Sequence, residues 1–284
     1  MKTKTILVPV DLSDHSKNLI NYATELAIRF NSRLIILHTH PLTNIPQTTA
    51  GYMGTVEPIY PTFADVEDYA AIKEDKLKVL DSFISEVPII RSVPYEKRIA
   101  IGQPSDLICE EARNNLVDLI VMGTSGASGL EEILVGTRGE SVTRNAPCPV
   151  LVLPEKCQYK PIRSIYLAVD EDSLEHNAQL ELLVKIARYF HSEVHMIYVT
   201  DKISREKGQL IMDKLNHAVN DLKYSFHIIT HDDPEKGLNS IIEENEVSLV
   251  ALIYREHNFL ERIFSPGLRK KMVFHTEKPL LILK

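Results

Sequence analysis

The chain has no tryptophan, few cysteines and no long apolar run. Its three cysteines, Cys109, Cys148 and Cys157, show neither paired nor metal-ligand spacing, so we expect reduced thiols in a cytoplasmic protein. No apolar run approaches membrane-spanning length, and the one near the N-terminus is too short for a signal peptide and stops at Asp11. A formal charge of −7 argues against nucleic acid or an anionic membrane as the main partner.

Glycine is also scarce, but it is concentrated in one stretch. Five of the 11 glycines lie between residues 122 and 141, after a strand-like apolar run at 118–122 and before a helix-like run that ends near Asn145. A strand followed by a glycine-rich loop and a helix start can hold phosphate, because glycines let the backbone approach a ligand and successive N–H groups face the anion. A glycine-rich surface turn is the alternative.

The first half alternates apolar strand runs with amphipathic helical runs. The strands are expected at 5–10, 33–38, 95–101, 118–122 and 150–153, with helices between them. This order predicts an open, doubly wound α/β domain with a parallel sheet, whose ligands bind beyond the carboxyl ends of the strands. Residues 41–62 carry four prolines and two glycines, and they form either a surface excursion or a flap near the ligand.

The chain then repeats itself. Residues 163–170 match residues 4–11 at an offset of 159, and the sequence from Pro234 to the end matches the sequence from Pro104 at an offset of 130, without a gap. A repeat of this length predicts two copies of one domain, at residues 1–154 and 162–284, joined by a linker at 155–161.

The glycine spacing is specific. Gly123, Gly126, Gly136 and Thr137 form the pattern G-x2-G-x9-G-T, which is neither a Walker A loop nor a Rossmann fingerprint. It resembles the nucleotide loop of the ATP-binding branch of the universal stress protein family, and the whole chain resembles a tandem universal stress protein. The resemblance implies a stress-response or regulatory protein that binds ATP, or AMP or ADP, with Mg²⁺ accompanying the triphosphate. The chain lacks a Walker lysine and an evident water-positioning base, so any ATP hydrolysis is expected to be slow.

The resemblance also implies roles for residues of the first half. Asp11 would bind the ribose hydroxyls, and Arg138 could reach a phosphate as a charge-assisted donor. From the residues alone, Asp11 could instead cap the first helix, Thr39 could be an ordinary strand end, and Arg138 could be solvated. Neither a catalytic group nor a metal site made of protein ligands alone is expected. The complete set is Pro9, Val10 and Asp11 for adenine and ribose, Thr39 for the adenine pocket, and Met122, Gly123, Thr124, Ser125, Gly126, Ala127, Ser128, Gly136, Thr137 and Arg138 for the phosphates.

The second half has lost the loop pattern. Ile253, Glu256, Pro266 and Gly267 stand where the first half has Gly123, Gly126, Gly136 and Thr137. An added side chain, a negative charge and a missing N–H donor all oppose phosphate binding, so one nucleotide per chain is expected. The second half would then partner the first or bind something unrelated. We expect the runs at 150–153 and 280–283 to pair as an intramolecular pseudo-dimer. Two chains could associate further into a homodimer, and no protein partner is identified.

Two other functions stay open. The first is an adenylating or pyrophosphate-releasing ATP enzyme. The PP-loop type carries Ser-Gly-Gly-x-Asp-Ser after its first strand, whereas residues 10–14 here read Val-Asp-Leu-Ser-Asp and lack both glycines. The second is an interaction scaffold that no longer binds nucleotide. Pyrophosphate release would favour the enzyme, and a purified protein without adenine absorbance or a thermal response to ATP would favour the scaffold.

Overall fold

The computed structural model describes residues 4–41, 63–124, 137–169, 180–200, 222–254 and 278–284, together with residues 209, 211 and 213. Within these ranges the side chains of residues 63–68, 137–138 and 234–235 are not described. The first half runs β1 (Lys4–Val10), α1 (Asp14–Phe30), β2 (Ser32–His40), α2 (Phe63–Ser85), the 3-10 helix η1 (Pro88–Ser92), β3 (Tyr95–Ile101), α3 (Pro104–Asn114), β4 (Leu119–Gly123), α4 (Thr137–Asn145) and β5 (Val150–Leu153). The second half runs β6 (Ser164–Val169), α5 (Glu181–Phe190), β7 (Glu193–Thr200), β8 (Tyr224–Thr230), α7 (Pro234–Glu244), β9 (Leu249–Ile253) and β10 (Leu280–Leu283).

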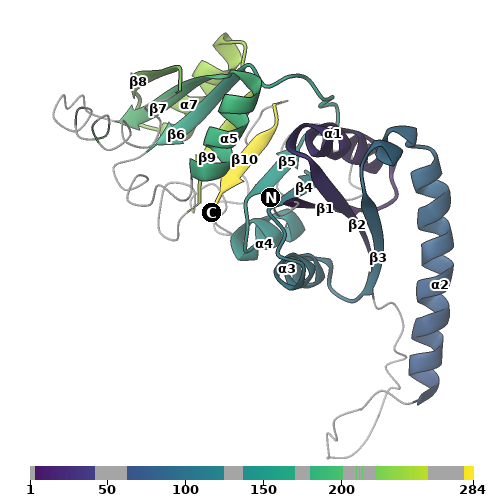
Figure 1. Cartoon of the computed structure of the whole chain (residues 1–284). Coiled ribbons are helices and arrows are strands. Elements are labelled where there is room, and N and C mark those ends of the chain that lie inside the picture. The colour runs from purple at the N-terminus through teal and green to yellow at the C-terminus, as the bar shows by residue number, and fades with distance from the viewer. Residues whose placement is uncertain are drawn as a thin grey trace, which may run out of the picture.

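The described strands form one ten-stranded sheet in the order β3-β2-β1-β4-β5-β10-β9-β6-β7-β8 (Figure 1). Each half has the same strand order, and the two halves run in opposite directions across the sheet, with β3 and β8 at its two outer edges. Neighbouring strands within each half are parallel, as a doubly wound α/β fold requires. Between the halves β5 and β10 pair antiparallel, with Leu281 opposite Leu151. This antiparallel pairing confirms that the runs at 150–153 and 280–283 pair with each other, as predicted.

Helices cover both faces of the sheet. One buried cluster joins Leu26 of α1 and Leu183 of α5 to the strand residues of one face. The other joins Ile108 of α3, Val142 of α4 and Leu238 of α7 to the strand residues of the opposite face. Strands buried on both faces read as continuous apolar runs, which is why the sequence located them well.

Local signals set the ends of α1. Ser13 is the N-cap, and its side chain accepts a hydrogen bond from the Ser16 N–H. Asn31 ends the helix in the left-handed region with φ 49°, and its N–H donates to the Ala27 carbonyl. The turn into α3 needs Gly102, whose φ of 142° is unfavourable for residues with a side chain.

The connection between the halves, residues 154–163, contains no helix or strand. It packs along α1, where the Asn18 amide donates to the Cys157 carbonyl. The Tyr159 ring meets Tyr22 edge-on with centroids 5.2 Å apart, and the Arg29 guanidinium lies 4.7 Å from the same Tyr159 ring. These contacts fix the connection against the first half before it enters β6.

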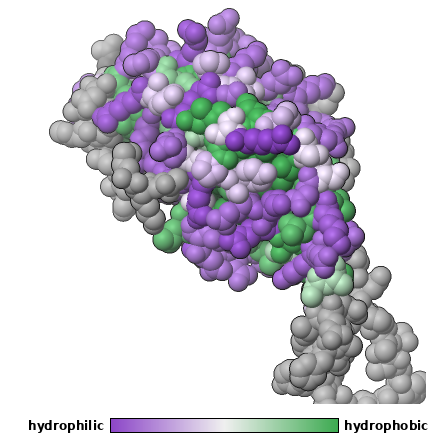
Figure 2. All heavy atoms as spheres, turned by 45° about the vertical axis from the view of Figure 1, so that its right-hand side comes forward, coloured by the Kyte–Doolittle hydropathy of each residue, from purple (hydrophilic) through white to green (hydrophobic). Residues whose placement is uncertain are grey.

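Polar residues cover much of the surface, and apolar stretches interrupt them on the face that Figure 2 shows. Among the described residues, no helix combines the length and the apolar composition needed to cross a bilayer. Two predicted features, the segment at 42–62 and most of the glycine-rich loop at 125–136, lie outside the described residues.

Candidate functional site

The carboxyl edge of the first half brings together the ends of β1, β2 and β4. β1 lies between β2 and β4, and Val10 is in register with His38. The Nδ1 of His38 lies 2.9 Å from the Val10 carbonyl oxygen, in hydrogen-bond contact that holds the two strand ends together. Burial lowers the pKa of His38, against the opposing effect of this hydrogen bond.

Asp11 organises the turn that follows β1. Its Oδ1 accepts hydrogen bonds from the Ser13 N–H at 3.0 Å and from the Ser16 hydroxyl at 2.7 Å. The Ser13 hydroxyl also donates to it, while the Asp11 N–H donates to the Ser16 oxygen at 3.0 Å. Ser13 and not Asp11 is therefore the helix cap, and Asp11 positions the cap while its own side chain stays exposed at the sheet edge.

Leu12 completes this turn in an unusual conformation. Its φ of 65° lies in the left-handed region, which costs a residue with a side chain roughly 1 kcal/mol. Its side chain nevertheless packs against the buried cluster under α1. Backbone strain of this kind often accompanies functional turns.

His15 fills the space beside the first loop glycine. A Cβ on Gly123 would lie 2.4 Å from the His15 Nε2 and 3.5 Å from Leu19 Cδ1, so the imidazole occupies the place of a side chain. The other ring nitrogen, Nδ1, lies 3.3 Å from the Glu155 carbonyl oxygen. The buried Nε2 has no hydrogen-bond partner among the described residues.

Thr124 presents a second such atom at the same edge. Its N–H donates to the Leu153 carbonyl at 3.2 Å, which continues the β4–β5 pairing by one residue. Its buried hydroxyl has no partner among the residues that the structure describes. Because buried polar atoms normally have partners, the two orphaned atoms mark this edge as a place where a ligand could supply them.

The second half keeps the backbone of this edge but has no glycine at the end of its strand. The Tyr254 N–H donates to the Leu283 carbonyl at 2.9 Å, as Thr124 does in the first half. Ile253 replaces Gly123 and is buried in the cluster beneath α5. An aliphatic side chain thus stands where the first half has a glycine.

The structure places the predicted site residues as follows. Pro9 and Val10 end β1, Asp11 follows it, and Met122 and Gly123 end β4 with Thr124 directly after. Thr39 lies within β2, which runs two residues beyond the predicted end. Thr137 and Arg138 begin α4, without described side chains. Ser125, Gly126, Ala127, Ser128 and Gly136 lie outside the described residues.

Sequence reasoning missed His15, Leu12 and Ser16. The Asp11-x-Ser13-x-x-Ser16 spacing could have revealed the turn, because short polar side chains at such offsets bond to nearby backbone groups. No local signal marks His15, because its contact with Gly123 spans the sheet edge. Among the described residues, no group of three or more His, Cys, Asp or Glu side chains could hold a metal ion.

Comparison with known proteins assigns the family. The model of the universal stress protein family matches residues 2–154. A universal stress protein of Thermus aquaticus is 30% identical over 151 residues, which cover 53% of this chain and 98% of that protein. YxiE, a universal stress protein of Bacillus subtilis, is 32% identical over 148 residues, covering 52% of this chain and 97% of YxiE. The chain belongs to the universal stress protein family.

Solved structures extend the likeness to the whole fold. A universal stress protein from Archaeoglobus fulgidus superposes with a TM-score of 0.71 at 18% identity, over 99% of this chain and 96% of that one. A Pseudomonas aeruginosa protein described as functionally unknown gives a TM-score of 0.62 at 15% identity, over 100% and 93%. At these identities the likeness concerns the fold alone.

Proposed function

We propose that the first half binds ATP, or another adenine nucleotide, and that the protein acts as a nucleotide-binding stress-response regulator. The observation that carries this proposal is the pair of orphaned buried atoms, His15 Nε2 and Thr124 Oγ1, at the edge where the glycine loop begins. The exposed Asp11 carboxylate lies at the same edge, at the end of the neighbouring strand.

Each group has a role in this proposal. Asp11 accepts hydrogen bonds from the ribose hydroxyls, and Thr39 lines the adenine pocket from β2. The loop that starts at Gly123 and ends at Thr137 and Arg138 surrounds the phosphates, where backbone N–H groups and the start of α4 favour negative charge. Mg²⁺ would enter with the triphosphate and take its ligands from phosphate oxygens and water. Hydrolysis would be slow, because the proposal includes no group that activates water.

Asp11 offers the sharpest test, because its partner in the repeat provides a control. Asp11→Asn keeps Oδ1 as acceptor for Ser13 and Ser16 but removes the charge. Hydrogen bonds to a charged group contribute roughly 1.5–3 kcal/mol, so calorimetry should show ATP affinity reduced about ten- to a hundredfold. Asp170→Asn, the same change in the second half, should leave the affinity unaltered. Equal affinity in the wild type and Asp11→Asn would contradict the assigned role.

The molecule that co-purifies with the protein tests the nucleotide class. Denaturing the purified chain should release an adenine nucleotide that mass spectrometry identifies. A protein that carries none, and whose thermal unfolding does not respond to added ATP, ADP or AMP, would support the scaffold function instead.

A further inference from the structure

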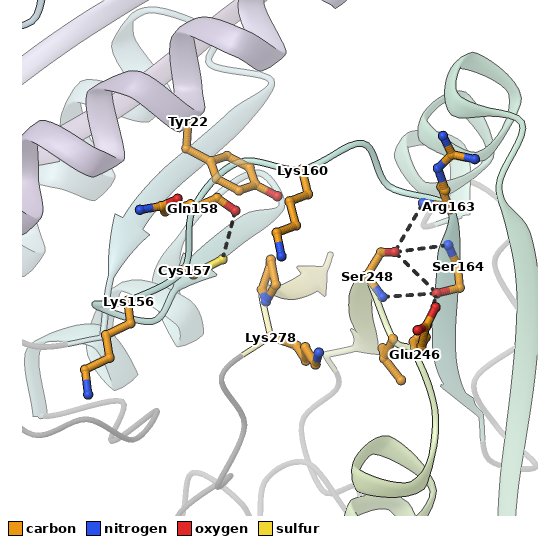
Figure 3. Close-up of a pocket in the computed structure, with 12 residues that line it drawn as sticks. Tyr22, Lys156, Cys157, Gln158, Lys160, Arg163, Ser164, Glu246, Ser248 and Lys278 are labelled. Atoms are coloured by element: carbon orange, nitrogen blue, oxygen red, sulfur yellow. Dashed lines mark hydrogen bonds between the residues drawn. The ribbon is translucent and has the colours of Figure 1, made fainter.

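A cavity, called the seam cavity below, lies between the two halves. Its volume is about 620 Å³, and it is lined from one side by the connection after β5 and from the other by the segments that precede β6, β9 and β10 (Figure 3). Tyr22 of α1 lines it as well. Cavities of this size commonly hold small molecules. None of the residues assigned above to the nucleotide site lines it.

Basic side chains dominate this seam cavity. Lys156, Lys160, Arg163 and Lys278 line it, against a single described acidic residue, Glu246. Figure 3 shows Lys160 reaching toward the middle of the cavity, with Lys156 and Arg163 at its two ends. Such a cluster is unexpected in a chain with a formal charge of −7.

Two of these charges lie near the thiol of Cys157. Burial raises the pKa of Cys157 to about 11, and the ammonium groups of Lys278 and Lys160 oppose that rise. Both lysines therefore bring positive charge close to the Cys157 thiol, which itself lines the cavity.

Comparison with the first half shows which replacements make this part of the second half more positive. In the first half the Asp118 carboxylate accepts a hydrogen bond from the Thr5 N–H at 2.9 Å, at the start of β1. At the matching place, the start of β6, the Ser248 hydroxyl accepts from the Ser164 N–H at 3.3 Å and from the Arg163 N–H at 3.2 Å. The neutral Ser248 hydroxyl thus accepts the same backbone hydrogen bond that the charged Asp118 carboxylate accepts in the first half.

A second replacement adds positive charge. At the offset of 130, Lys278 occupies the place of Cys148, which is buried in the first half. The two replacements, Asp118 by Ser248 and Cys148 by Lys278, each raise the net charge by one, and Glu246 in the place of Leu116 lowers it by one, so this corner is more positive by one charge than its counterpart. All three of these second-half residues line the seam cavity.

We propose that the seam cavity is a binding site for a small phosphate-bearing anion, distinct from the nucleotide site of the first half. Lysine ammonium groups bind phosphate oxygens as point charges, and two of them line the cavity, Lys160 from the connection and Lys278 from the segment before β10. Because residues of the connection and of the second half both line the cavity, an occupant would contact both. A single copy of the domain could not form this site, because the site combines residues of the connection with residues of the second half.

Inorganic pyrophosphate is the probe that tests this site. The titration uses the full chain carrying Gly126→Glu, so that the loop of the first half competes much less for the anion. In this background Ser248→Asp restores the carboxylate that the first half has, while its oxygen still accepts from the Ser164 N–H. A unit negative charge a few ångströms from the ligand should weaken pyrophosphate binding by roughly tenfold or more. Ser248→Asn, a neutral acceptor, should bind within about threefold of the background protein.

A second pair of variants separates the cavity from general surface charge. Lys160→Gln should weaken binding, whereas Lys73→Gln, the same change at an exposed position on α2, should not. Thermal unfolding of each variant confirms that it is folded. The proposal is overturned if the Gly126→Glu chain does not bind pyrophosphate, if Ser248→Asp and Ser248→Asn bind equally, or if the two lysine variants behave alike.

Discussion

The imidazole of His15 fills the space beside Gly123 that a side chain would need, and a double mutant can test this contact. Gly123→Ala would place a Cβ 2.4 Å from His15 Nε2, so the imidazole must move. Overpacking of this kind costs about 1–3 kcal/mol, and we expect that loss in the free energy of unfolding. Adding His15→Ala should restore most of it. A double-mutant cycle by urea unfolding measures the coupling, and additive effects would show that the two residues do not contact.

His38 predicts a pH dependence of stability. Burial lowers its pKa in the folded protein, helped by nearby His40 and Lys76 and opposed by the Val10 carbonyl and Asp11. As the pH falls, His38 therefore binds a proton in the unfolded chain first, near the ordinary histidine pKa of about 6.5, and in the folded protein only at lower pH. The contribution of His38 is complete above that pH and is lost as the pH falls through the lowered folded value.

His38→Asn isolates this contribution. The asparagine amide can still donate to the Val10 carbonyl but does not titrate. Urea unfolding should show that the variant loses less stability than the wild type between pH 7.5 and 5.5, while the two run parallel above pH 7.5. Identical slopes over the acidic range would exclude His38 as the source.

At the residue scale, the sequence predicted the positions with a chemical signature and missed those defined by tertiary contacts. Asp11 and Gly123 were singled out because one follows a strand and the other belongs to a glycine pattern. His15 carries no local signal, and its importance arises only because α1 folds over the end of β4. Asp11 also has a helix-organising role that spacing alone could not separate from ligand binding.

Among the elements, the connection between the halves packs against α1 through the ring of Tyr159. Tyr159 contacts Tyr22 edge-on and the Arg29 guanidinium through its ring, and such contacts contribute roughly 0.5–1.5 and 0.5–1 kcal/mol. Its hydroxyl is buried without a partner among the described residues. Tyr159→Ala should therefore lose about 2 kcal/mol of stability, whereas Tyr159→Phe should be neutral or slightly stabilising.

Chemical denaturation of both variants checks this prediction. Tyr189→Ala serves as control, since that ring is 48% exposed and should contribute less. A marked loss in Tyr159→Phe would mean that the hydroxyl has a partner, and a neutral Tyr159→Ala would mean that the ring does not hold the connection.

Most helices and strands were predictable because apolar periodicity fixes them. The predicted strand at 95–101 matches β3, and α2 lies between β2 and β3, where a helix was expected. The short η1 was not predicted, because its turns depend on Pro88 and on packing rather than on a repeated pattern. β2 extends to His40 because β3 pairs with it through that residue, which local sequence does not show.

At the scale of the molecule, the repeat determines the architecture. The offset of 130 carries β4 onto β9 and β5 onto β10 with identical bounds. Pairing of β5 with β10 covers two strand edges that would otherwise be open. The internal repeat thus predicted how the halves pair, whereas no sequence pattern indicated the cavity between them.

The first half is proposed to bind nucleotide and the second half is not, and binding stoichiometry measures this difference most directly. Calorimetric titration of the wild-type chain with ATP should give one nucleotide per chain. Gly126→Glu, which copies the residue of the second half into the first, should weaken binding about ten- to a hundredfold, as expected when a negative charge faces phosphate. Glu256→Gly should create no second site, since Ile253 and Pro266 remain. A stoichiometry near two, or full affinity in Gly126→Glu, would contradict the account.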